Sequence, residues 1–217
     1  MRTTGSEDDM TFPERPDHNA DVQTSTAHAA NAAEPPAPVT LMTYTLLELP
    51  QWVIGDTHWF HVNIAAYAGR PSNHEALMIA GWRETVDEAD TILHLGDVAL
   101  GPREGFRDRM PSLPGHIYFL RGNHDSRGKA ALLEDLDWRL VLPFSLPYRG
   151  WRIEFCHAPH PITTPRTIQV HGHLHQHPAP SSAHINVSVE QIGYRPVALQ
   201  PLLAARMVDL EHQDTAP

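Results

Sequence analysis

The chain has 217 residues, a formal net charge of −10 and a single cysteine, Cys156. One cysteine excludes an intrachain disulfide and every zinc site built on two or more thiolates. The acidic balance disfavours unaided binding of duplex nucleic acid, and no apolar run approaches the ~20 residues of a membrane span. We therefore expect a cytoplasmic protein with no membrane partner, of a length that suits one folded domain.

Both ends of the sequence are predicted to be tails. Residues 1–40 carry seven acidic and two basic side chains, half of the net charge, and end in an Ala/Pro-rich run. Such a segment has too little apolar surface to offset the entropy lost on folding, so we predict a disordered acidic tail. Residues 206–217 are predicted to form a short C-terminal tail, which leaves residues 41–205 as the folded domain.

Short apolar runs alternate with helical patterns between the two tails. Helices are predicted over about 72–88, where Ser72 and Glu75 have the spacing of a capping box, and over 126–137, with Ser126 as the N-cap. This mixture without a strict β-α-β rhythm predicts an α/β protein with a mixed sheet or two sheets. The runs typical of strands are 52–55, 91–95, 117–120, 151–155, 168–170 and 185–189.

Residues able to bind a metal follow five of these predicted strands, at the point where each strand ends. Because strands converge at one edge of a sheet, such residues can meet in space despite wide sequence gaps. Glycines directly before Asp97, Asn123 and His173 allow a sharp exit from the strand and close backbone approach. The five groups are Asp56-Thr57-His58, Gly96-Asp97, Gly122-Asn123-His124-Asp125, His157 and Gly172-His173-Leu174-His175.

The residue types in these groups predict a centre for divalent metals. Carboxylate, imidazole and amide oxygen, with no thiolate, suit Mn²⁺, Fe, Zn²⁺ or Ni²⁺. One carboxylate such as Asp97 can bridge two ions, and two ions ~3.5–4 Å apart are a common device for cleaving phosphate esters. His173 and His175 are two residues apart as the chain leaves a strand, so they can address the same cluster.

The ordered set of motifs resembles the calcineurin-like metallophosphoesterase superfamily over residues of about 51 to 190. The segments DTHWFHVNI (56–64), HLGDVALG (94–101), RGNHD (121–125) and NVSVEQIGYRPV (186–197) resemble a small bacterial and phage branch of predicted phosphoesterases. The resemblance implies a four-layer α/β sandwich of two mixed β-sheets flanked by helices. That branch usually has glycine where Phe60 stands, and a bulky ring there reshapes the rim of the site without removing a ligand.

The resemblance also implies a dinuclear enzyme that hydrolyses phosphate esters by in-line attack of a metal-bridging hydroxide. Mn²⁺ is the first expectation, with Fe, Zn²⁺ or Ni²⁺ as alternatives. His124 would stabilise or protonate the leaving oxygen, a role that suits histidine near neutral pH, and Asp125 would orient it. The implied ligands are Asp56, His58 and His175 for the first metal, Asn123, His157 and His173 for the second, and Asp97 as the bridge.

Three further residues are candidates for contact with the substrate: His61, Asn63 and Arg195. The first two follow the Asp-x-His motif, where supporting His58 is an equally good interpretation. Arg70 is expected on the surface, and His94 is expected to be a buried, hydrogen-bonded histidine. The substrate is predicted to be a small phosphorylated compound, nucleotides included, with phosphodiesters favoured over monoesters.

Other metal-binding classes fit the sequence less well. HGHLHQH (171–177) superficially resembles the metallo-β-lactamase motif, but His175 stands where that motif needs Asp. Barrel amidohydrolases place His-x-His on their first strand, and a histidine-rich metal buffer would not need glycines at strand ends. The alternative that stays open is a non-catalytic metal-binding scaffold of the same fold. The presence of all seven predicted ligands and of His124 argues against it.

Overall fold

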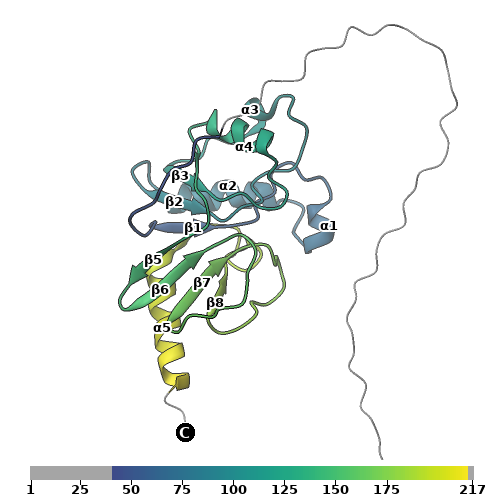
Figure 1. The fold of residues 1–217 in the computed structure, drawn as a ribbon. Helices are drawn as coiled ribbons and strands as arrows, with labels where there is room; N and C mark the ends of the chain where they lie inside the picture. The colour runs from purple at the N-terminus through teal and green to yellow at the C-terminus, as the bar shows by residue number, and fades with distance from the viewer. Residues whose placement is uncertain (1–40, 215–217) are drawn as a thin grey trace, which may run out of the picture. The chain divides into compact units, whose positions relative to one another are not determined.

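The computed structural model describes residues 41–214; the acidic tail predicted for residues 1–40 lies outside them, as do residues 215–217. The described chain forms two mixed β-sheets flanked by helices (Figure 1), which confirms the predicted fold class. In this part of the chain, no helix combines the length and apolar character needed to cross a bilayer.

The first sheet contains five strands: Trp52–Ile54 (β1), Thr91–His94 (β2), His116–Phe119 (β3), Arg139–Leu140 (β4) and Val197–Ala198 (β9). Their order is β4-β3-β2-β1-β9, with β1 to β4 parallel and β9 antiparallel to β1. Ile54 lies opposite His94, and His94 lies opposite Phe119. The carboxyl ends of β1, β2 and β3 are therefore level with one another at one edge of the sheet.

The second sheet contains four strands: Phe144–Tyr148 (β5), Trp151–Phe155 (β6), Thr167–His171 (β7) and His184–Asn186 (β8). Their order is β5-β6-β7-β8, and β5 is antiparallel to β6 while the other pairs are parallel. Gly55, directly after β1, forms a parallel bridge to Ser188, which follows β8. This bridge joins the carboxyl edges of the two sheets.

Five helices flank the sheets: Ile64–Ala68 (α1), His74–Thr85 (α2), Phe106–Arg109 (α3), Arg127–Glu134 (α4) and Leu199–Asp214 (α5). The predicted N-cap of α4 is confirmed, because Ser126 Oγ accepts a hydrogen bond from Lys129 N at 3.3 Å. The predicted capping box of α2 does not form. Its N-cap is Asn73, and Glu75 Oε1 instead accepts a hydrogen bond from Phe60 N at 3.0 Å.

The predicted C-terminal tail is wrong over residues 206–214, which continue helix α5. Leu199, Leu203 and Met207 recur every four residues and are buried in the core of the second sheet. Tertiary packing of such a stripe stabilises a helix whose remaining faces are polar. The apolar stripe is narrow, so the helical spacing of its apolar residues is hard to recognise in the sequence. The folded domain therefore extends to Asp214.

Alternate residues of the central strands face two separate apolar cores. Ile54 and Ile92 pack with Trp82 of α2, whereas Val53 and Leu93 pack in the core that the second sheet shares. Central parallel strands covered on both faces are apolar throughout, which is why the sequence pattern located them well. Full burial of each aliphatic side chain contributes roughly 1.5–3 kcal/mol to stability.

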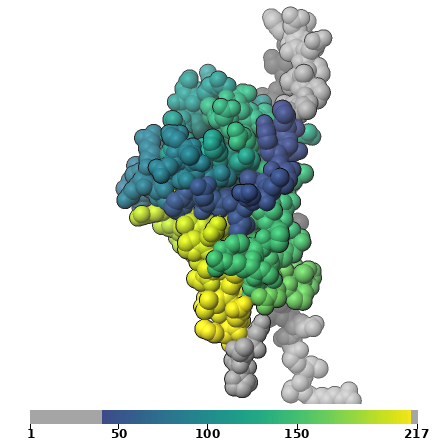
Figure 2. Space-filling view, turned by 90° about the vertical axis from the view of Figure 1, so that its left-hand side faces the viewer, coloured from purple at the N-terminus to yellow at the C-terminus, as the bar shows by residue number. Residues whose placement is uncertain are grey.

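The first described residues cover the junction between the sheets (Figure 2, purple). Tyr44 N donates a hydrogen bond to Leu140 O at 2.7 Å, and Tyr44 forms a parallel bridge with Val141. Leu46 and Leu49 pack against the core of the second sheet. This segment therefore belongs to the folded domain, as its predicted boundary at residue 41 requires.

Candidate metal centre

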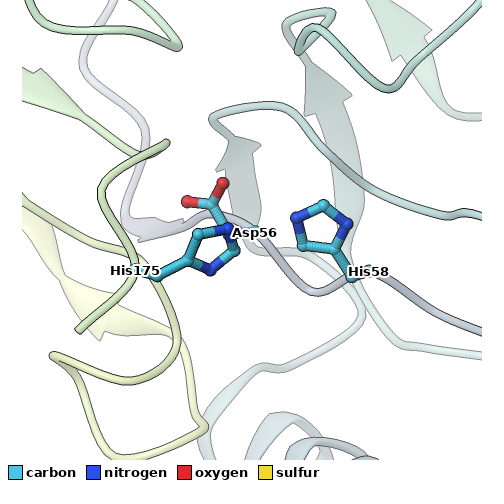
Figure 3. Close-up of side chains that lie close together, drawn as sticks. All are labelled: Asp56, His58 and His175. Carbon is cyan, nitrogen blue, oxygen red and sulfur yellow. The ribbon is translucent and has the colours of Figure 1, made fainter. Parts of the chain in front are cut away.

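Side chains from loops after β1, β2, β6 and β7 meet where the carboxyl edges of the two sheets join. The structure gathers six of the predicted ligands into two groups, within each of which the ligand atoms lie within 4.8 Å of one another. We call them the first group and the second group. The first group is Asp56, His58 and His175 (Figure 3), and the second group is Asp97, His157 and His173.

Asp97 and Asn123 occupy the positions that their predicted roles require. Asp97 Oδ2 lies 3.5 Å from His58 Nε2 and 3.4 Å from His157 Nε2, between the two groups. Asn123 Oδ1 lies 2.9 Å from His157 Nε2 and 3.0 Å from His173 Nδ1. The structure thus brings all seven predicted ligands together, and their binding of metal stays a prediction.

The backbone turns sharply at these positions because five of the seven residues adopt left-handed conformations. The φ angles are 56° at Asp56, 49° at His58, 54° at Asp97, 71° at His173 and 50° at His175. Such conformations cost about 1–3 kcal/mol each in residues other than glycine and persist only where surrounding contacts impose them. Hydrogen bonds between adjacent loops supply such contacts, from Asp56 N to Gly96 O and from His58 N to Asp97 O, both at 3.0 Å.

Glycines next to the ligands allow the close approach that the sequence predicts. A Cβ atom on Gly96, whose φ is 92°, would lie 2.6 Å from Gly122 N and 2.7 Å from His157 Nδ1. A Cβ atom on Gly122 would overlap the Asp97 carboxylate, and one on Gly172 would overlap the Asp56 carboxylate. Any side chain at these three positions would therefore displace a predicted ligand.

The first group is buried and holds polar atoms without partners. Asp56 is 0% exposed and His58 is 1% exposed. Asp56 Oδ2 accepts hydrogen bonds from His173 N and Ser188 Oγ, both at 2.8 Å, but Asp56 Oδ1 and both ring nitrogens of His58 have no hydrogen-bond partner. Buried polar atoms without partners are rare because their desolvation is not compensated, so this group fits a bound cation.

Burial also shifts the pKa values of the first group. It raises the pKa of Asp56 to about 6 and lowers the pKa of His58 to about 2. His58 is thus neutral at physiological pH, with a lone pair available to a cation. A divalent ion beside Asp56 would favour its ionised form and reverse its shift.

The second group is more open and places acceptor atoms face to face. His157 Nδ1 lies 2.8 Å from Leu95 O, so that nitrogen carries a hydrogen and Nε2 is directed toward Asp97 and Asn123. Burial opposes protonation of His157, but its hydrogen bond and attraction to Asp97 raise its pKa to about 8. Asn123 Oδ1, His157 Nε2 and His173 Nδ1 thus meet as three acceptor atoms. They need either a proton or a cation between them, which again fits a bound metal.

His124 lies at the open side of the centre, where its predicted catalytic role requires it. Its side chain is 44% exposed, and its Nε2 lies 4.0 Å from Asp97 Oδ2. Its ring centroid lies 5.3 Å from that of His58. The backbone N–H of His124 donates to Asp97 Oδ1 at 2.9 Å, which fixes the loop relative to the centre.

Asp125 does not have the role predicted for it. Its carboxylate accepts hydrogen bonds from the backbone N–H groups of Asp97 (2.7 Å), Gly122 (2.9 Å) and Val98 (3.1 Å). Within residues 41–214, no hydrogen bond joins this carboxylate to the ring of His124. Asp125 is 1% exposed and fastens the loop after β2 to the loop after β3, so it positions Asp97 and not His124.

The three candidate substrate residues lie in different places. His61 is beside the centre, with its ring centroid 5.6 Å from that of His58, and Asn63 is exposed in the same loop without capping α1. The Nη1 atom of Arg195 lies 3.9 Å from Glu84 Oε2, and its contact with the substrate stays a prediction. Glu75, whose carboxylate accepts a hydrogen bond from Phe60 N in the loop after β1, lies nine residues before Glu84 on α2. Nine residues of helix span about 13 Å.

Two residues of the centre were missed by sequence reasoning. Arg70, expected on the surface, is buried, and its guanidinium donates to the backbone oxygens of Asp56 and Thr57. Glu190 accepts hydrogen bonds from Arg70 and from the Nδ1 atom of His175. Glu190 lies within NVSVEQIGYRPV, one of the segments that carries the resemblance, but neither residue has a local pattern that predicts this contact.

The structure confirms that His94 is buried and hydrogen-bonded. His94 is fully buried and bonds Thr57 Oγ1 at 2.9 Å, and Cys156 is a buried thiol whose pKa burial raises to about 12. Phe60 has a φ of 68°. Glycine adopts such a left-handed conformation without steric cost, which explains why related sequences have glycine at this position. Its ring packs against Phe106, and the Arg109 guanidinium lies 4.4 Å from the ring centroid.

Comparisons with known proteins agree with this geometry. The chain is 34% identical to the uncharacterized protein MJ1445 of Methanocaldococcus jannaschii over 163 residues, which make up 68% of this chain and 86% of the relative. It shares the fold of the crystal structure of AQ665, a protein of unknown function from Aquifex aeolicus, with a TM-score of 0.57 and 24% identity over 71% of this chain and 97% of that one. The family model described as calcineurin-like phosphoesterase matches residues 49–188. The match covers more than half of the sequence, and the chain therefore belongs to the calcineurin-like phosphoesterase family.

Proposed function

We propose that this protein is a dinuclear metal-dependent phosphodiesterase that acts on small phosphorylated compounds, nucleotides included, with Mn²⁺ as its metal. Membership of the family and the two adjacent ligand groups support phosphoester hydrolysis in general. The observation that carries the proposal is Asp97, whose Oδ2 atom lies about equally far from His58 Nε2 and His157 Nε2. One carboxylate between two groups of ligands is what a bridged pair of ions needs.

The two groups divide the tasks of the site. Two divalent cations, when bound, supply positive charge that activates a water molecule and neutralises the phosphoryl oxygens. Asp56, His58 and His175 would hold the first ion in buried surroundings, where electrostatic interactions are strong. Asn123, His157 and His173 would hold the second ion near the open side, where a substrate enters.

His124 is proposed to assist the leaving group. Its exposed ring lies next to Asp97 and is free to approach the ester oxygen of a substrate. A histidine in this place can donate a proton to a leaving alkoxide near neutral pH. Because Asp125 is engaged by backbone N–H groups, the charged form of His124 draws its support from Asp97, 4.0 Å away.

The preference for a diester follows from the charge that the site offers. A monoester carries up to two negative charges and gains more from a free cationic side chain than a diester does. The guanidinium of Arg70 is fully engaged by two backbone carbonyls and Glu190, so it is not available to phosphate. A diester also has a second substituent, which the open side of the second group accommodates.

The test is a comparison of bis-p-nitrophenyl phosphate with p-nitrophenyl phosphate, using metal-free protein reconstituted with Mn²⁺. We expect turnover of both, a higher kcat/KM for the diester, and loss of activity in chelator with recovery on adding metal. A higher kcat/KM for the monoester would contradict the diester preference. Tight binding of two ions without hydrolysis of either ester or of a nucleotide panel would instead favour the non-catalytic scaffold.

A further inference from the structure

We propose that Arg70 and Glu190 form a positioning pair that fixes the geometry of the first group and sets its metal affinity separately from that of the second group. The inference rests on the proposed function, because it takes Asp56, His58 and His175 to hold a cation. It assigns a role to two residues outside the seven predicted ligands.

Arg70 holds the backbone from which two of the ligands project. Its side chain is 0% exposed, with Nη2 donating to Asp56 O at 2.6 Å and Nη1 donating to Thr57 O at 2.8 Å. These carbonyls belong to the turn in which Asp56 and His58 both have left-handed backbone. A rigid guanidinium that binds two successive carbonyls fixes the plane of each peptide, and thereby the directions of the Asp56 and His58 side chains.

Glu190 links this turn to the third ligand of the first group. Its Oε1 atom lies 2.8 Å from Arg70 Nε, 2.7 Å from Arg70 Nη2 and 3.0 Å from His175 Nδ1. The contact places the hydrogen of the His175 ring on Nδ1 and leaves the Nε2 lone pair for a cation. A carboxylate that accepts from a ligating histidine also strengthens that histidine as a ligand.

The burial of the pair is better explained by positioning than by stability. The side chains of Arg70 and Glu190 are 0% and 5% exposed, so both charges have lost nearly all contact with water. A buried ion pair contributes little net stability, because desolvation offsets most of the attraction. Here the two side chains contact the carbonyl of Asp56, the carbonyl of Thr57 directly before His58, and the ring of His175.

The second group is supported in a different way. His157 Nδ1 is held by the backbone oxygen of Leu95 and not by a carboxylate such as the one that holds His175. Asp97 is held through the loop contacts of Asp125. A change in the Arg70–Glu190 pair should therefore affect one ion and spare the other, which a general loss of folding would not do.

The experiment measures the affinity of each group for Mn²⁺ in separate backgrounds. His173→Ala removes a ligand of the second group and leaves the first group to report alone, and His58→Ala does the reverse. Glu190→Gln keeps the shape and an acceptor oxygen but removes the charge. We expect it to weaken Mn²⁺ binding about 10- to 100-fold in the His173→Ala background, with little change in the His58→Ala background.

Two further variants separate positioning from damage to the fold. Glu190→Asp keeps the charge and should recover part of the lost affinity. Glu154→Gln is a matched control, because Glu154 Oε1 accepts from Arg152 Nε at 2.8 Å and Oε2 lies 4.0 Å from His160 Nε2, outside both groups. We expect Glu154→Gln to leave Mn²⁺ affinity unchanged in both backgrounds.

Titration calorimetry and elemental analysis give an outcome for each proposal. Equal weakening of both groups by Glu190→Gln, or no weakening of either, overturns the positioning pair. Uptake of fewer than two ions by the unaltered protein overturns the proposed dinuclear function, and the inference with it. Visible absorption of Co²⁺-loaded His173→Ala provides a second readout, because loss of the Glu190 charge should change the ligand field of the first ion alone.

Discussion

The two halves of the metal centre use the same kinds of side chain in different surroundings. In the first group, Asp56 and His58 are buried, and an enclosed ion pair contacts the Asp56–Thr57 backbone and the ring of His175. In the second group, His173 is partly exposed, the adjacent Asn123 is exposed, and His157 relies on a backbone carbonyl. The first half is thus set before a cation arrives, whereas the second half has its acceptor atoms turned toward solvent and substrate.

This difference shows how one sheet edge can build two unequal sites. The first group follows β1 and β7, and two of its three members, Asp56 and His58, are buried. The second group follows β2, β6 and β7, and its outer ligands lie at the open side next to His124. We expect the buried half to hold its ion more tightly and the open half to exchange its ion and meet the phosphate.

Asp97→Ala should have the largest effect, because this residue lies between the two halves. We expect loss of at least ~10³-fold in kcat/KM, since removal of one electrostatic contact in a preorganised site already costs up to that much. Both halves should lose affinity for Mn²⁺, as measured by titration of the metal-free protein. A variant that retains two ions per chain would show that Asp97 does not bridge.

His124→Ala should separate chemistry from metal binding. Its ring is not among the atoms that make up either group, so two ions per chain should remain. Turnover of esters with poor leaving groups should fall by at least ~10²-fold, the usual contribution of a general acid. Nitrophenyl esters, whose leaving group needs no proton, should be affected much less, and an equal loss on both would remove His124 from that role.

Gly122→Ala should disturb the centre through packing alone. An added methyl group would overlap the Asp97 carboxylate, so Asp97 must move. We expect Mn²⁺ affinity to fall about 10- to 100-fold, the range seen when support of a ligand is lost. Gly105→Ala is a control for general destabilisation, because its φ of 63° strains any side chain while nothing lies within 4 Å of the added atom; it should leave Mn²⁺ affinity unchanged.

Much of this centre could be predicted because each ligand directly follows a strand. The strands β1, β2 and β3 are mostly apolar, and a glycine lies shortly after each of them, so the sequence shows where each loop begins. Parallel strands then bring the loops to one edge whatever their separation in sequence. This accounts for the meeting of Asp56 and Asp97, whereas His157 follows β6 of the second sheet and joins them because the carboxyl edges of the two sheets meet.

The rest depends on contacts that leave no local trace. Arg70 and Glu190 are 120 residues apart, and each looks like an ordinary surface charge in its own segment. Asp125 is adjacent to His124 in sequence, but its carboxylate binds the backbone of the neighbouring loop. The two-residue strands β4 and β9 exist only through their pairing, and α5 shows its apolar stripe only once the second sheet is in place.

The smallest effect we predict is the dependence of the second half on pH. In the metal-free protein, attraction to Asp97 raises the pKa of His157 to about 8, whereas burial and the neighbouring histidine lower the pKa of His173, and the pKa of Asp97 is also lowered. His157 is therefore the protonated member of the second group at pH 7. A cation must displace that proton, so Mn²⁺ affinity should rise about tenfold per pH unit up to pH 8 and then level off.

Calorimetry of the His58→Ala variant in buffers of different ionisation enthalpy measures this proton directly. About one proton should be released per Mn²⁺ at pH 7 and almost none at pH 9, because His157 is then already neutral. Release of no proton at pH 7 would show that His157 is neutral in the metal-free centre. The Nε2 atom of His157 would then be an unprotonated acceptor directed toward Asp97 and Asn123. In that case neither half of the centre would have to lose a proton before a cation binds.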